Sequence, residues 1–88
     1  MYNAASADAG ATLLQGMPVA ERFFKLGMMC STGQSMPLDM VSAHKWFNIA
    51  AMLGMEDAVR LRNEIVAEMS DREIATAQRA ARHWLTRH

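Results

Sequence analysis

Apolar residues recur at helical spacing in four stretches of the chain, and short polar or glycine-containing segments separate them. In the second stretch, Ala43, Phe47 and Ala50 lie three and four positions apart, which places them on one face of a helix. The last two stretches repeat this spacing, with Ile65 and Ala77 among their apolar positions. The pattern predicts helices over about 18–32, 40–53 and 56–69, and from about 71 to the C-terminal end.

Capping residues mark the ends of these helices. Asp39 is a good N-cap, because its carboxylate accepts hydrogen bonds from free N–H groups and favours the positive end of a helix. Gly54 is the residue expected just past a helix C-terminus, and Ser70 with Glu73 forms a capping box. Four helices with short connections predict an all-α fold of two antiparallel αα-hairpins. The predicted parts are an arm or short helix over 1–16, a hairpin over 17–55 and a capping hairpin over 56–88.

Composition and charge narrow the class of protein. The chain has 88 residues, which suits one small domain, and 51% of them are hydrophobic. Nine basic and nine acidic residues balance, so no overall field attracts nucleic acid or an anionic membrane. No apolar run approaches the ~20 residues of a membrane span. The first residues lack the basic flank and apolar stretch of a secretion signal, and a single cysteine cannot form an internal disulfide. Both observations favour a cytoplasmic location. A periplasmic location stays open if the N-terminus was trimmed.

A set of small, aromatic and capping residues follows a fixed spacing in the middle of the chain. It comprises Leu26, Gly27, Gly33, Asp39, Ala43, Trp46, Ala50, Ala51, Gly54 and Ala58. In residue type and spacing the set resembles the Sel-one-like repeat, a relative of the tetratricopeptide repeat. Gly27 and Ala43 are small enough for two helices to cross closely, and Trp46 is a large apolar plug. The resemblance implies a fragment of a tetratricopeptide-like α-α superhelix, with 17–55 as the repeat.

The chain departs from the repeat pattern at two positions. Cys30 stands where the family has an aromatic residue, which removes bulk. Ser35 stands where it has a second turn glycine, so the turn is expected to manage without a residue that adopts positive φ freely. The resemblance covers less than half of the chain, and 56–88 lacks the Leu-Gly signature, which is typical of a closing hairpin.

The resemblance also implies a function, because Sel-one-like proteins generally act as adaptors. We therefore expect a non-enzymatic protein-interaction module with no cofactor, binding a protein or peptide on the face lined by the first helix of each hairpin. The candidate contact residues are Arg22, Lys25, Met28 and Met29 on the first helix and Arg62 on the third. The cations would steer an acidic segment, and the methionines would supply adaptable apolar contacts.

Two alternatives stay open. Cys30, with His44 as a base, could serve a thiol-dependent or regulatory function, although a buried, inert thiol and an exposed His44 on a polar face are the expected arrangement. The last helix has three arginines and no acid over 74–88, so weak nucleic-acid binding is the other alternative.

Neither a metal site nor an acid–base pair is expected. His83 and His88 could join Cys30 around zinc only with difficulty, because their spacing of five does not suit one helical face. The carboxylates of the second hairpin have structural explanations near helix ends or beside arginines, as in the pair Arg60–Glu64.

The first helix is apolar on every side and needs cover on both faces. We expect the arm to fold back as a short helix with Leu13 and Leu14 against Phe23 or Phe24, which would leave a monomer. The alternatives are that a second copy covers the helix in a dimer, or that a missing upstream segment covered it. The residues expected to be mostly buried are Gly27, Ala43, Trp46, Phe47, Ala50, Leu61, Ile65, Ile74, Ala77 and Ala81.

Overall fold

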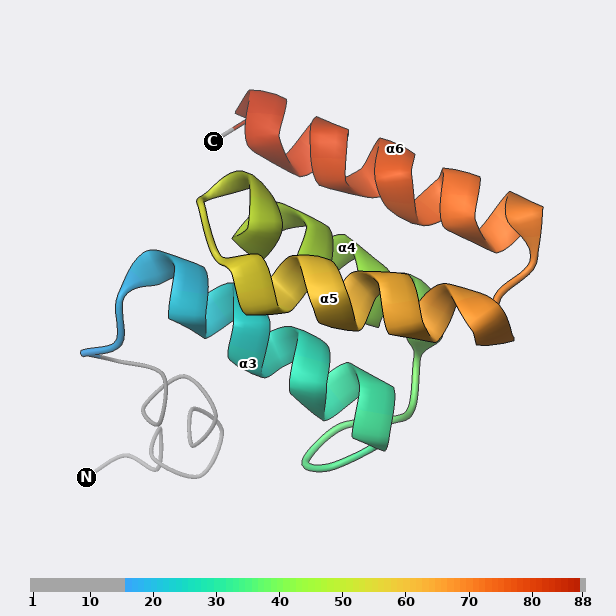
Figure 1. Ribbon diagram of the computed structural model, residues 1–88, viewed down its shortest axis with the longest axis horizontal. Coiled ribbons are helices and arrows are strands. Elements are labelled where there is room, and N and C mark those ends of the chain that lie inside the picture. The colour runs from blue at the N-terminus through green and yellow to red at the C-terminus, as the bar shows by residue number, and fades with distance from the viewer. Residues whose placement is uncertain (1–15, 88) are drawn as a thin grey trace, which may run out of the picture.

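The computed structural model describes residues 16–87, and within this range the protein is all-α, as predicted (Figure 1). Its helices are α3 (Val19–Thr32), α4 (Met40–Met52), α5 (Glu56–Ile65) and α6 (Asp71–Arg87), with a 3₁₀ turn, η1 (Val66–Glu68), between the last two. No strand occurs in this part of the chain. The expected contacts of Leu13 and Leu14 lie outside the described residues.

Helix α4 occupies the centre of the domain and packs against α3, α5 and α6. In Figure 1, α3 and α4 form an antiparallel pair, and α5 and α6 also run in opposite directions. However, α6 lies along α4 rather than along α5. The second pair of helices is therefore antiparallel, as predicted, but it closes the fold by placing α6 on the central helix.

The predicted caps form. The Asp39 carboxylate accepts hydrogen bonds from the backbone N–H of Ser42 at 3.0 Å and from its hydroxyl at 2.8 Å. At the start of α6, the Ser70 N–H donates to Glu73 at 2.8 Å, and the Glu73 N–H donates to the Ser70 hydroxyl at 3.1 Å. Gly54 follows α4 with a φ of +100°, which suits a residue without Cβ.

The third helix is shorter than the predicted range 56–69. It ends at Ile65, and the next residues tighten into η1, in which the Met69 N–H donates to the Val66 carbonyl at 3.1 Å. Met69 itself is extended, with φ −120° and ψ 148°. A continuous helix would run past this point, so the tighter turn lets the chain reverse into the Ser70 cap.

The turn between α3 and α4 places a serine, Ser35, in a left-handed conformation. The sequence offers no glycine at this position, so the turn was expected to manage without a residue that adopts positive φ freely, and Ser35 itself adopts a φ of +69°. The Asp39 N–H donates to the Cys30 carbonyl at 2.9 Å, which ties the two ends of the turn together. That closure leaves few residues to reverse the chain, so a serine takes the conformation that glycine takes elsewhere.

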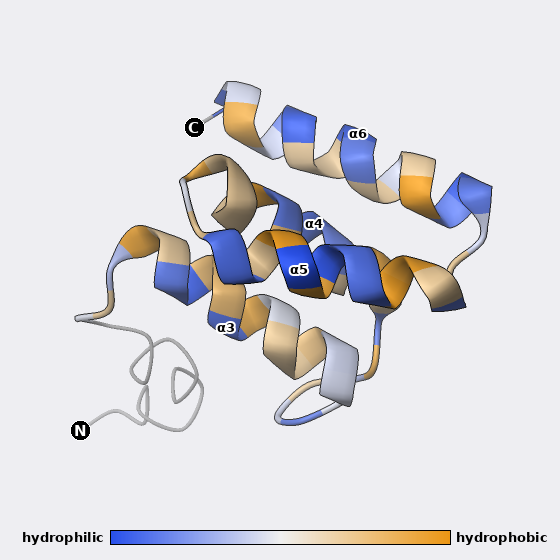
Figure 2. Ribbon diagram, in the orientation of Figure 1, coloured by the Kyte–Doolittle hydropathy of each residue, from blue (hydrophilic) through white to orange (hydrophobic). Residues whose placement is uncertain are grey.

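The core lies where α3 and α5 meet α4. The predicted core residues Gly27, Ala43, Phe47, Ala50, Ile65, Ala77 and Ala81 are buried, whereas Trp46, Leu61 and Ile74 are half-buried. Ile49 is fully buried as well, although the predicted stripe of α4 omitted it. Figure 2 shows that α3 is apolar over most of its length, while α5 and α6 carry hydrophilic residues on their outer sides.

Candidate interaction surface

Two basic residues lie on the outer side of α3. Arg22 and Lys25 are both exposed and one turn apart, in the half of the helix nearer its N-terminus. The Arg22 Nε donates to the Met17 carbonyl at 2.8 Å, which holds the guanidinium beside the first turn. Lys25 forms no ion pair with any other residue of the range 16–87. The exposed ammonium of Lys25 is thus available to a partner, whereas Arg22 also supports the start of α3.

The two methionines of the predicted surface face inward. Met28 is half-buried and packs against the core residues, and Met29 is only 7% exposed. A side chain that is already buried offers little area to a partner. The adaptable methionine surface expected on α3 is therefore reduced to the exposed part of Met28.

Arg62 lies on α5 and is engaged with the central helix. Its Nη1 donates to Oδ1 of Asn48 on α4 at 2.8 Å, and its Nε donates to Asn63 at 3.4 Å. Arg62 is half-buried and Asn48 is buried. This arginine therefore joins α5 to α4, and the structure does not bring it together with Arg22 and Lys25 as part of one exposed group.

His44 was expected to be exposed on a polar face, and this prediction is wrong. Its side chain is 2% exposed, and its Nδ1 is buried with no hydrogen-bond partner. Burial lowers the pKa of His44 below its ordinary value, and the positive charge of Arg62 lowers it further. The error has a physical cause: α4 is covered on three sides, so a position away from the main apolar stripe is buried too.

Three aromatic rings from three helices meet beside α4. The ring of Phe23 stacks on Trp46 with centroids 5.5 Å apart, and Trp84 of α6 meets Phe23 edge-on at 4.8 Å. The Lys45 ammonium lies 4.0 Å from the centroid of the Trp46 ring. All three aromatic side chains are half-buried. The sequence pattern predicts a core plug at Trp46 but not this cluster, because the cluster depends on the placement of α6.

Cys30 is buried, as expected for an inert thiol. Its side chain is 4% exposed, and its Sγ lies 3.3 Å from the sulfur of Met36. Burial raises the pKa of the Cys30 thiol, and the Asp39 charge raises it further, while Lys45 acts in the opposite direction. A raised pKa and little access to solvent both disfavour a nucleophilic thiolate.

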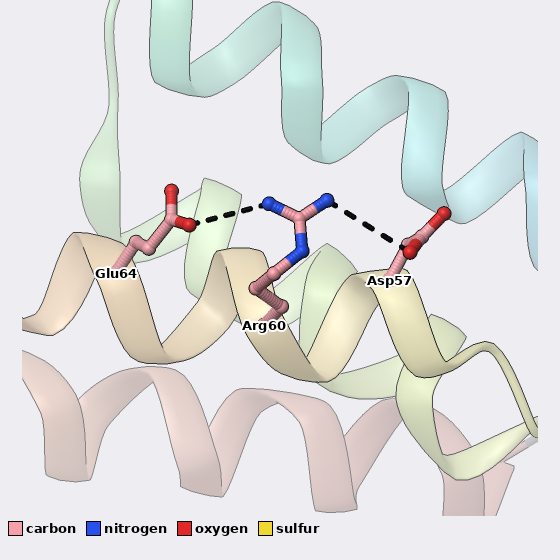
Figure 3. A network of polar contacts seen from close by, with 3 residues as sticks. All are labelled: Asp57, Arg60 and Glu64. Carbon is pink, nitrogen blue, oxygen red and sulfur yellow. Dashed lines mark hydrogen bonds and ion pairs between the residues drawn. The ribbon is translucent and has the colours of Figure 1, made fainter.

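The carboxylates of α5 take part in ion pairs on the surface. Arg60 lies between Asp57 at 3.8 Å and Glu64 at 3.3 Å, which includes the predicted pair Arg60–Glu64 (Figure 3). All three side chains are exposed, so each pair contributes little to stability. His83 is exposed on α6, and His88 lies outside the described residues. Within residues 16–87, no three His, Cys, Asp or Glu side chains form a group suited to a metal ion.

No protein-family model, curated protein or solved structure matches this chain. None of the helices in residues 16–87 has the length and apolar character that a bilayer-spanning segment requires. Residues 16–87 thus form a small four-helix domain, in which the exposed basic residues of α3 are separate from the polar group that His44 and Asn48 of α4 form with Arg62 of α5.

Proposed function

We propose that this protein is a non-enzymatic interaction module of the Sel-one-like type, which binds an acidic protein segment on the outer side of α3. Arg22 and Lys25 are the residues that make the contact, with the exposed part of Met28 beside them. Arg62 has a positioning role, because it holds α5 on α4.

The observation that carries this proposal is that some residues of α3 pack in the core whereas its cations are exposed to solvent. Gly27 is taken up by the crossing with Phe47, and Cys30 is buried in the core, so these positions serve the fold. Lys25 is exposed and without an ion pair inside residues 16–87. An exposed cation on a helix held rigidly from behind suits electrostatic recognition of a carboxylate-rich segment.

The neighbouring acid limits how strong this recognition can be. Glu21 is exposed one turn before Lys25, so the local excess of positive charge is small. Binding is also expected to weaken with added salt, because the charges involved are exposed and salt screens exposed charges over about 8 Å at physiological ionic strength.

The test is an affinity pull-down with the full chain as bait and partners identified by mass spectrometry. The double variant R22E/K25E should lose a partner that the unchanged protein retains. A matched control, R79E/R82E, reverses two exposed charges on α6 and should keep that partner. Thermal unfolding of both variants verifies that they fold.

The possible results distinguish binding on α3 from binding on α6. Retention of every partner by R22E/K25E contradicts the proposed surface. Loss of the partner in R79E/R82E alone favours the basic helix α6 instead, and nuclease treatment of the sample then tells a protein partner from a nucleic acid.

A further inference from the structure

His44 and Asn48 on α4 and Arg62 on α5 form a polar group at the core of the domain. Within it, the buried Nδ1 of His44 has no hydrogen-bond partner. His44 and Asn48 lie one turn apart on α4, with exposed fractions of 2% and 8%. Asn48 accepts a hydrogen bond from Arg62, whereas the Nδ1 of His44 has no partner. A neutral imidazole can be buried in this way at moderate cost, but a protonated one carries a charge and an N–H that both need compensation.

Among residues 16–87, no buried acid is present to compensate such a charge. Every aspartate and glutamate in residues 16–87 is exposed. From α5, the charged group that acts on His44 is Arg62, and its charge has the same sign as a protonated imidazole. The other charged residues of α5 are Glu56, Asp57, Arg60 and Glu64, all exposed.

The other described helices that pack on α4, α3 and α6, contribute no buried counter-charge either. On α3 the charged residues Glu21, Arg22 and Lys25 are exposed, and the buried titratable group is the Cys30 thiol. On α6 the buried positions are Ala77 and Ala81, while its charged residues are exposed. On α4 itself, the Lys45 ammonium lies over the Trp46 ring.

We propose that His44 makes the packing of α5 on α4 sensitive to acid, because a proton taken up at its buried nitrogen adds a positive charge in the field of Arg62, with no buried carboxylate among residues 16–87 to balance it. The contact that this charge should weaken most is the hydrogen bond from Arg62 to Asn48. Mild acidification therefore weakens the packing of α5 on the central helix, and with it the stability of the folded domain. This inference does not depend on the proposed partner.

The direction of the effect follows from proton linkage. The pKa of His44 in the folded protein lies below its ordinary value of 6.5, so the unfolded chain binds the proton more readily. The unfolding equilibrium constant then rises by up to about tenfold for each pH unit below 6.5, until the folded value is reached. Above about pH 7.5 both states are neutral at this site, and the dependence ends.

The experiment follows thermal unfolding of the full chain between about pH 7.5 and 5.5, a window above the ordinary titration of carboxylates. The variant H44L should be less dependent on pH than the unchanged protein in this window. The control H83Q removes an exposed imidazole and should keep the dependence. Equal pH dependence in H44L and the unchanged protein overturns the proposal.

A direct measurement keeps the test decisive if H44L does not fold. The imidazole signals of the unchanged protein are followed by NMR across the same range, and the His44 signal should titrate with a midpoint below 6.5. The variant R62M should move that midpoint upward, because it removes a repelling charge. A midpoint at or above 6.5 in the unchanged protein overturns the proposal, as does an unmoved midpoint in R62M.

Discussion

The ring of Phe47 lies directly on the backbone of Gly27, where α3 crosses α4. A Cβ at position 27 would lie 2.6 Å from both Cδ1 and Cε1 of Phe47. Non-bonded carbon atoms pack best at about 3.5–4.0 Å, so this approach leaves no room for a side chain. Phe47 is only 1% exposed, and its ring is confined by the core around it. The missing side chain of Gly27 thus sets the distance between the two helices.

Replacing Gly27 with alanine should destabilise the protein. The added methyl group gains about 1 kcal/mol in helix propensity. Overpacking a filled core costs about 1–3 kcal/mol and should outweigh this gain at a 2.6 Å contact. Chemical denaturation of G27A measures the difference, and the double variant G27A/F47L is the control. Removing the ring should make the alanine at 27 much less costly, and equal costs in both backgrounds would contradict the steric account.

Replacing Ser35 with glycine should stabilise the protein. Ser35 has a φ of +69°, a conformation that costs a non-glycine residue about 1 kcal/mol. Glycine removes this strain at an entropic cost in the unfolded chain, so the expected net gain is a few tenths to about 1 kcal/mol. The matched control is Q34G, because Gln34 is not among the residues with positive φ and should only lose stability. A lower melting temperature for S35G would show that the strain is absent.

Replacing Asp39 with alanine should cost about 1 kcal/mol, the usual loss for an N-cap that accepts hydrogen bonds. The backbone and hydroxyl hydrogen bonds from Ser42 hold the pKa of Asp39 below its ordinary value of 3.8. The stabilisation from this carboxylate is therefore complete above the unfolded pKa and is lost as the pH falls through the lower, folded value. Denaturation at pH 7 and at about pH 2.5 measures this, and the difference between D39A and the unchanged protein should shrink at the lower pH. A difference that stays constant would assign the cap to neutral hydrogen bonding alone.

Cys30 should resist thiol reagents in the folded protein. It is 4% exposed and burial raises the pKa of its thiol, so both access and thiolate population are low. A colorimetric disulfide reagent at neutral pH should react slowly with the native chain and rapidly once denaturant unfolds it. Fast modification without denaturant would restore the alternative of a thiol-dependent function.

Local features of this fold could be predicted from the sequence, and features set by helix placement could not. Asp39 and the pair Ser70–Glu73 act on neighbours three residues away, so their roles follow from spacing alone. His44 was misplaced because an amphipathic pattern assumes one buried face, whereas α4 has neighbours on three sides. The meeting of Phe23 with Trp84 likewise depends on where α6 lies.

The same distinction applies to the candidate surface. Arg22 and Lys25 are exposed, as a polar position on an outer helix predicts. Arg62 was expected beside them, but its partner Asn48 lies on another helix, and no spacing along the chain indicates that contact. Whether an arginine serves the fold or a partner is therefore decided by what lies across the helix interface.

The central position of α4 determines how this chain can come apart. Each of the other helices covers a different side of α4, so removal of any one of them exposes part of it to water. A fragment that stops after Met55 would contain the predicted hairpin 17–55 and yet lack the cover that α5 and α6 give. Cooperative unfolding as one unit is the consequence, with the slowest amide exchange in α4 and the fastest at the ends of the outer helices. The segment that resembles a repeat is thus not a module that can be excised and transplanted.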